Sequence, residues 1–153
     1  MKELIIVANQ PSANTRLLAD AVTRGAQHPD ISNVTVSCFT PLEATVDKVQ
    51  NADGIIIGTT ENFGYMSGLI KDFFERIYYP CLETKQGLPY ALYIKAGLDG
   101  TGTTTAVNKI ISGLRWREVH DLVLLKGEYQ SSFELQCEEL GTHMAAGLEA
   151  GIF

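Results

Sequence analysis

Apolar residues are spaced in two different ways along this chain, which indicates two kinds of secondary structure. Three short runs, residues 4–8, 55–57 and 90–94, are almost continuously apolar, as in strands that are buried on both faces of a sheet. A strand with every second residue apolar is predicted over residues 34–38, and a further strand over residues 119–125. The pattern therefore predicts five strands separated by longer segments.

Between these strands, apolar residues recur every three to four positions, which is the spacing of helices with one buried face. This spacing predicts a helix from near Thr15 and two others over 106–114 and 133–148. Strands that alternate with helices form a parallel sheet, because each crossover between parallel strands is long enough for a helix. We expect one α/β domain over residues 1–153, with a doubly wound five-stranded parallel sheet and helices on both faces.

Local chemistry predicts the ends of two further helices. Thr40-Pro-Leu-Glu43 has the spacing of a capping box with proline at the first helical position, which predicts a short helix from this point that buries Leu42. Another helix is predicted from near Met66 to about residue 78, where the proline at position 80 is expected to end it.

Composition and charge narrow the classes of function. The formal net charge of -6 argues against nucleic-acid binding, because phosphate backbones are bound by basic surfaces. No apolar run is long enough to span a bilayer and no signal peptide is evident, so we expect a cytoplasmic protein without a membrane partner. The cysteines Cys38, Cys81 and Cys137 are widely spaced and are predicted to be free thiols, with Cys38 and Cys137 in the core.

The chain shows no pattern of metal ligands and no convincing catalytic pair. Its three histidines lack the spacing of metal ligands, and we assign no metal site and no catalytic residue. The candidate chemistry lies instead in the strand-to-helix connections. In a parallel sheet these connections meet at the carboxyl ends of the strands, where doubly wound α/β proteins bind their ligands.

Three of these connections have unusual sequences. Asn9–Thr15 leads into a helix N-terminus, whose free N–H groups attract phosphate, although helix capping by Asn14 or Thr15 explains the same residue types. Thr59–Tyr65 combines hydroxyls and glycine with aromatic rings, so that a planar ligand can stack there. Ala96–Thr103 contains three glycines, which let a ligand approach the backbone closely.

These connections lack two common nucleotide-binding motifs. No Gly-Lys-Ser/Thr sequence of a P-loop is present, and the connection after the first strand contains no glycine, unlike the dinucleotide-binding fingerprint. Together with the aromatic residues of the second connection, this points to a flavin rather than to a nucleoside triphosphate or a metal.

Two of the connections resemble those of a known family. Ser12-Ala-Asn-Thr15 is similar to the phosphate loop of flavodoxin-like proteins, and Gly58–Arg76 is similar to the second flavin loop and helix of their small NAD(P)H-dependent FMN reductase branch. The resemblance implies that FMN is the cofactor and NAD(P)H a co-substrate. It implies these cofactor-binding residues: Gln10, Ser12, Ala13, Asn14, Thr15, Thr59, Thr60, Glu61, Asn62, Phe63, Gly64, Gly97, Asp99, Gly100 and Gly102.

The resemblance also implies roles for these residues. Residues 12–15 are expected to hold the FMN phosphate, and residues 59–64 are expected to line the isoalloxazine ring. Residues 97–102 are expected to form a third wall of the site. Phe63 either stacks on the flavin or packs into the core below the loop, and Glu61 either bonds the ring or ribityl group or is solvated. Two positions depart from the family pattern, because Ala13 replaces a usual glycine and Thr60 a frequent proline.

Two functions follow from this resemblance. The first is an oxidoreductase in which FMN accepts a hydride from NAD(P)H and electrons pass to a quinone, a flavin, a similar small molecule or a redox protein. A homodimer or tetramer is expected, with Phe74, Tyr78, Tyr79 and the last helix as candidate contact surfaces. The second is a flavodoxin-type electron carrier. Carriers tend to cover both faces of the flavin with aromatic side chains, whereas Phe63 is the one clear aromatic residue in these connections, which favours the enzyme. A third alternative is a protein that keeps this fold but binds no flavin.

Overall fold

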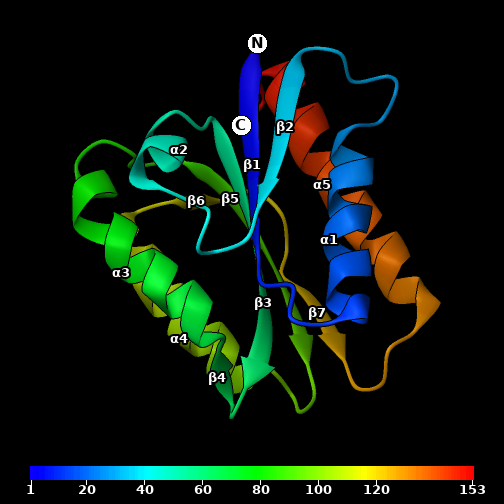
Figure 1. Ribbon diagram of the computed structural model, residues 1–153. Helices are drawn as coiled ribbons and strands as arrows, with labels where there is room; N and C mark the ends of the chain where they lie inside the picture. Colours follow the sequence, from blue (N-terminus) through cyan, green and yellow to red (C-terminus); the bar gives the residue numbers. More distant parts are fainter.

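A parallel sheet forms the centre of the molecule, described by a computed structural model of residues 1–153 (Figure 1). Its strands are β1 (Lys2–Ala8), β2 (Val34–Phe39), β3 (Gly54–Asn62), β4 (Tyr65–Met66), β5 (Pro89–Ala96), β6 (Arg117–Glu118) and β7 (Val123–Lys126). The strand order is β2-β1-β3-β5-β6, and β7 also pairs with β5 in parallel. Only β4 is antiparallel, and it pairs with the end of β3.

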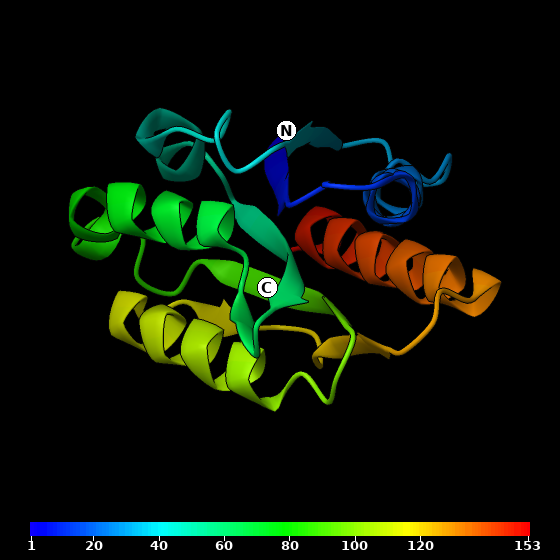
Figure 2. The same ribbon diagram turned by 60° about the horizontal axis from the view of Figure 1, so that its bottom comes forward.

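Five helices cover the two faces of this sheet. They are α1 (Ala13–Ala26), α2 (Val46–Gln50), α3 (Gly68–Leu82), α4 (Thr101–Leu114) and α5 (Ser131–Ala150). Figure 2 shows α1 and α5 on one face and α2, α3 and α4 on the other. The predicted doubly wound parallel sheet with helices on both faces is therefore confirmed, and its fifth strand is divided between β6 and β7.

The core consists of two apolar layers that share the central strands. Successive side chains of a strand point to opposite faces, so Ile5 and Val7 of β1 lie in the apolar layer covered by α2, α3 and α4. Leu4 and Ile6 of the same strand pack towards α1 and α5. All four are buried, which explains why this strand is apolar without alternation.

Tyr93 fills the α1–α5 layer next to the carboxyl end of β3. Its ring lies against Gly58, its partner in the register of β3 and β5, and a Cβ at position 58 would overlap the ring. The Tyr93 hydroxyl is buried and has no hydrogen-bond partner. Burial raises the pKa of this phenol well above its usual value, so the hydroxyl stays neutral.

The helix predicted from Thr40 does not form there. The Glu43 carboxylate accepts from the Thr40 N–H at 3.4 Å, which is half of a capping box, but it also accepts from the Thr40 hydroxyl at 2.7 Å. The chain makes only turns before α2 begins at residue 46. Arg76 of α3 donates to the carbonyls of Pro41 at 2.6 Å and Ala44 at 2.7 Å. These two bonds hold the turn against α3. The side chain of residue 42, predicted to be buried, is exposed.

The boundaries of α3 also differ from the prediction. The helix begins after Ser67, whose hydroxyl accepts from the N–H groups of Leu69 and Ile70, so Met66 lies in β4 instead. It continues through Pro80 to residue 82. A proline in the last turn removes one backbone donor, and the burial of Cys81 holds that turn against the core.

Two smaller differences concern the fifth strand and the cysteines. Of the strand predicted over 119–125, only residues 123–125 form one, as part of β7. The polar residues His120 and Asp121 interrupt the apolar pattern before it, and β6 ends at residue 118. All three cysteines are free, as predicted, and Cys137 lies in the core. Cys38 is only half-buried, because it lies on the edge strand β2. No helix is long and apolar enough to cross a membrane.

Tyr93→Phe is expected to raise the free energy of unfolding by about 1 kcal/mol, because it removes a buried hydroxyl without a partner. For a chain of this length, the gain corresponds to a rise of about 2–4 °C in Tm, measured by thermal unfolding. Tyr90→Phe is the matched control, since the Tyr90 hydroxyl bonds Glu118 at 3.3 Å and its removal should not stabilise the protein. A loss of stability in Tyr93→Phe would contradict the expectation.

Candidate functional site

The three unusual connections lie together at the carboxyl edge of the sheet, at the lower end of the molecule in Figure 1. The first runs from the end of β1 into α1, and the second follows the parallel part of β3. The third joins β5 to α4. Side-chain hydrogen bonds link the first to the second and the second to the third. The sequence prediction that these connections meet is therefore confirmed.

The first connection ends in a capping box. The Ser12 hydroxyl accepts from the N–H of Thr15 at 3.2 Å, and the Thr15 hydroxyl accepts from the N–H of Ser12 at 2.9 Å. Ser12 is thus the cap, rather than Asn14 or Thr15, which the sequence offered as alternatives, and α1 begins at Ala13. The helix supplies no acceptor for the N–H groups of Ala13 and Asn14, which lie at the positive end of its dipole.

Two other residues of this connection have different environments. Ala13 is part of α1 and does not have a positive φ, so alanine at this position carries no backbone strain. Gln10 points away from the other connections, because its amide nitrogen lies 3.4 Å from the carbonyl of Ala8 and 3.9 Å from the sulfur of Cys38.

The second connection is a β-hairpin rather than an irregular loop. Past its parallel part, β3 pairs with β4 through Glu61 with Met66 and through the next pair along the strands. The turn consists of Phe63 and Gly64, with φ values of 55° and 71°. Two-residue hairpin turns with positive φ at both positions match the twist of the strands.

Phe63 at the tip of this hairpin is fully exposed. The alternative that its ring packs into the core is therefore wrong. A bulky residue in the left-handed region costs about 1–2 kcal/mol, and Asn or Gly is usual at such positions. A strained backbone that holds an aromatic ring in solvent is typical of a residue with a binding role rather than a folding role.

Polar side chains at the end of β3 connect the hairpin to its surroundings. The buried Thr59 hydroxyl accepts from the N–H of Ser67 at 3.0 Å and so ties β3 to the start of α3. The Thr60 hydroxyl accepts from the Asn9 amide at 3.0 Å and donates to the Asn62 side chain at 2.9 Å. Threonine in place of the frequent proline therefore links the first connection to the hairpin.

Glu61 links the hairpin to the third connection. Its two carboxylate oxygens accept from the N–H of Leu98 at 2.7 Å and from the N–H of Gly100 at 2.8 Å. This arrangement differs from both alternatives considered from the sequence. The two segments also touch at Gly102, where a Cβ would overlap the carbonyl oxygen of Gly64.

Residues 97–99 of the third connection are exposed, whereas Gly100 is buried. The Asp99 carboxylate accepts from the N–H of Thr101 at 3.0 Å, and this bond lowers its pKa below the usual value. Gly97 has open space where a Cβ would lie, and the Leu98 side chain is exposed. Gly100 has a φ of 72°, a conformation that favours glycine, and precedes the first residue of α4.

Two residues of these connections, Asn9 and Leu98, link parts of the site although they are not among the predicted cofactor-binding residues. Asn9 is a nearly buried amide placed directly after the apolar residues of β1, and a polar residue at that point is a usable sequence signal. Leu98 has no such signal, because an apolar residue among glycines does not indicate whether it is buried.

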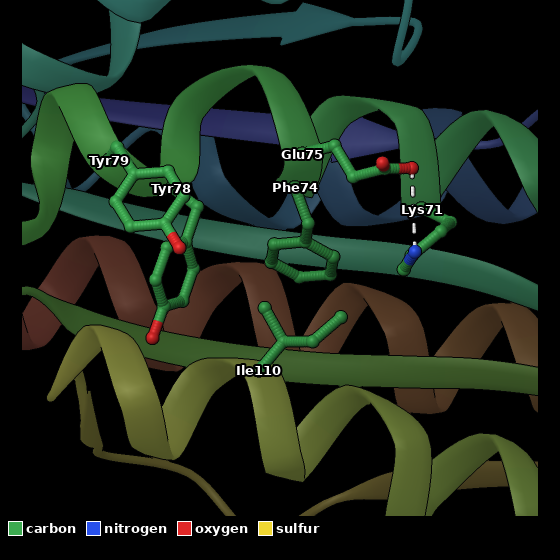
Figure 3. Close-up of a pocket in the computed structure, with 6 residues that line it drawn as sticks. All are labelled: Lys71, Phe74, Glu75, Tyr78, Tyr79 and Ile110. Atoms are coloured by element: carbon green, nitrogen blue, oxygen red, sulfur yellow. Dashed lines mark ion pairs between the residues drawn. The ribbon is translucent and has the colours of Figure 1, made fainter.

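A separate groove of about 240 Å³ lies between α3 and α4 (Figure 3). None of its lining residues belongs to the predicted flavin site. Lys71 and Glu75 form an ion pair of 3.4 Å at one end, and Tyr78 and Tyr79 lie at the other. Phe74 lines the groove although its side chain is almost fully buried. No group of His, Cys, Asp or Glu side chains is arranged to hold a metal ion.

Comparison with known proteins assigns the family. Residues 1–130 match the family described as NADPH-dependent FMN reductase, and the chain belongs to this family. The resemblance in the first two connections is thereby confirmed. None of the proteins with curated descriptions matches the chain in sequence.

Solved structures confirm the flavodoxin-like fold. A flavodoxin from the domain Archaea has a TM-score of 0.79 at 17% identity, over 96% of this chain and 99% of that one. A flavodoxin, WrbA-like protein from Agrobacterium tumefaciens has a TM-score of 0.78 at 16% identity, over 99% of both chains. Rubredoxin oxygen:oxidoreductase from Desulfovibrio gigas has a TM-score of 0.80 at 13% identity, and 37% of its chain is covered.

Gly102→Ala is expected to lower the free energy of unfolding by about 1–3 kcal/mol, because the new methyl group would overlap the Gly64 carbonyl. The better helix propensity of alanine, about 0.5–1 kcal/mol, does not offset this clash. Urea unfolding of the variant measures the change. Gly97→Ala is the matched control in the same segment and should be nearly neutral; an equally stable Gly102→Ala would show that the hairpin and α4 are not in close contact.

Proposed function

We propose that residues 1–153 form a single FMN-binding domain of a NAD(P)H-dependent oxidoreductase that passes electrons to a quinone, a flavin or a similar small acceptor. Membership of the NADPH-dependent FMN reductase family supports this function. The observation that carries it is Phe63, an exposed aromatic ring on a strained turn beside two other ligand-compatible segments. The three free cysteines favour a reducing compartment such as the cytoplasm.

The start of α1 fits the phosphate of FMN. The N–H groups of Ala13 and Asn14 are free of helical acceptors, the first turn contains no acidic residue, and the helix is 14 residues long. In our proposal, these N–H groups and the exposed Asn14 amide supply most of the donors. The hydroxyls of Ser12 and Thr15 bond one another and hold the turn in shape. Because the buried Thr15 hydroxyl can donate to Ser12, the O–H of the exposed Ser12 is left to donate to the phosphate.

The hairpin and the third connection fit the isoalloxazine. Phe63 is proposed to stack on the ring, while Asn62 and the backbone of Gly64 lie beside it. The segment from Gly97 to Gly102, which is exposed except at Gly100, is proposed to form the other wall. Bound FMN would supply hydride acceptance and electron transfer. The chain's own residues would bind and orient it, and no residue needs to act as an acid or a base.

One face of the bound ring is expected to stay open. The third connection contains no aromatic residue, and its only large apolar side chain is the exposed Leu98. An open face admits a nicotinamide and then an acceptor, which favours the enzyme over the electron carrier. The carrier remains the second candidate, because the net charge of -6 suits a basic redox partner.

The groove between α3 and α4 is our candidate for a subunit contact in a homodimer or tetramer. Tyr79 is mostly exposed at its edge, and Tyr78 lines it. The buried position of Phe74 limits that residue to the floor of the groove. The exposed side of α5 is the other candidate surface.

The purified protein mixed with FMN is expected to retain flavin absorption in the visible range after removal of unbound flavin. It should then oxidise NADH or NADPH when a quinone is present and no other protein is added. Retained flavin without NAD(P)H oxidation would favour the electron carrier. A colourless protein after the same treatment would contradict both functions.

Phe63→Asn is expected to change stability and FMN affinity in opposite directions. Asparagine tolerates a positive φ, so the free energy of unfolding of the flavin-free protein should rise by about 1 kcal/mol. Loss of the stacked ring should weaken FMN binding by about tenfold, measured by quenching of flavin fluorescence.

Arg115→Asn is the matched control for this variant. Arg115 follows the C-terminal end of α4 and has a φ of 60°, so asparagine relieves the same backbone strain there. The candidate flavin site lies at the other, N-terminal end of α4. Its FMN affinity should equal that of the wild type. If Phe63→Asn also binds FMN normally, Phe63 does not stack on the ring.

A further inference from the structure

Glu61 is the one side chain that bonds the hairpin directly to the third connection. Its partners, Leu98 and Gly100, lie 37 and 39 residues further along the chain. Both N···O distances are below 3 Å, as expected for bonds from N–H groups to a charged acceptor. Both carboxylate oxygens are used, so Glu61 is fully committed to this link.

Residues 97–99, at the tip of the third connection, have few other contacts, although Ala96, Gly100 and Thr103 on either side of them are buried. The side chains of Leu98 and Asp99 are exposed, and Gly97 has no neighbour near its Cβ position. The Asp99 carboxylate bonds only the N–H of Thr101, two residues away in the same segment. Without Glu61, the N–H groups of Leu98 and Gly100 would lose their acceptor, and residues 97–99 would have no hydrogen bond to the hairpin.

Adjacent residues of β3 reach in opposite directions. Successive side chains of a strand alternate between the two faces of the sheet, so Thr60 and Glu61 point to different sides. Thr60 bonds Asn9 of the first connection, while Glu61 bonds the third connection. The end of β3 thereby sets the positions of both neighbouring segments.

We propose that Glu61 is a positioning residue, whose carboxylate fixes the distance and orientation between the Phe63 hairpin and the third connection. These are the two walls of the isoalloxazine site, so the inference rests on the proposed function for its effect on FMN. Glu61 acts through the backbone of Leu98 and Gly100 and does not need to touch the flavin.

The test compares Glu61→Ala and Glu61→Gln with the wild type in three measurements. Amide hydrogen exchange at Leu98 and Gly100 is measured without flavin, FMN affinity by fluorescence titration, and ring orientation by visible circular dichroism of the bound flavin. In Glu61→Ala, exchange at both amides should accelerate and FMN affinity should fall, each by about tenfold or more. Glutamine keeps one acceptor oxygen, so it should recover part of both properties and of the circular dichroism signal.

Glu128→Ala is the matched control, because it also removes one exposed carboxylate from a connection at the same edge of the sheet. Glu128 makes no side-chain hydrogen bond and should leave exchange and affinity unchanged. If Glu128→Ala lost as much FMN affinity as Glu61→Ala, the loss would come from the change in net charge alone, and the inference would be overturned.

The two proposals fail in different ways. If the wild type binds FMN and Glu61→Ala binds it equally well, the positioning role is wrong and the proposed function stands. If the wild type does not bind FMN, the proposed function is wrong and so is any effect of Glu61 on flavin. The exchange rates then decide separately whether Glu61 orders the third connection, and unchanged rates overturn that role too.

Discussion

The placement of β3 in the middle of the sheet is the constraint on which the rest of the molecule depends. It pairs with β1 on one side and β5 on the other, and its residues Ile55–Ile57 are buried on both faces. A strand in this position has its backbone groups satisfied by two neighbours, so its carboxyl end leaves the sheet at one defined point. Gly58 is part of the same constraint, because the Tyr93 ring occupies the space of its missing side chain. The hairpin, and with it the candidate site, begins directly beyond this position.

The candidate site combines a rigid base with a strained tip. Thr59, Thr60 and Glu61 each bond a different segment, so the base of the hairpin is tied to α3, to the first connection and to the third. The tip carries Phe63 in a left-handed conformation with its ring in solvent. Such a conformation persists only where the surrounding bonds over-determine it, and here they do. The strain is therefore a consequence of how firmly the hairpin is anchored, and it leaves the ring free for a ligand.

Much of the fold could be predicted because its signals are local. The continuous apolar runs predicted the strands that are buried on both faces, and the helical spacing of apolar residues predicted the long helices that are buried on one face. In both cases the burial sets which of the neighbouring residues are apolar. The errors have one common cause. The side chains of Thr40 and Glu43 do bond one another, yet no helix begins there, and Arg76, 32 residues further along the chain, holds the turn through the carbonyl of Ala44. Likewise Pro80 does not end α3, because burial of Cys81 outweighs the loss of one donor. Distant contacts override local preference when they satisfy or bury more than it does.

The sequence by itself determined the order of strands and helices, the edge of the sheet at which ligand-compatible segments meet, and the family to which they are similar. These properties follow from hydrophobic period and from residue types within short segments. Only the tertiary structure decided that Phe63 is exposed rather than packed, that Ser12 caps α1, and that Glu61 bonds the third connection. The physical reason is that a polar side chain bonds whichever partner the folded chain brings within about 3 Å. The partners of Glu61 lie 37 and 39 residues away, and no local sequence pattern indicates them.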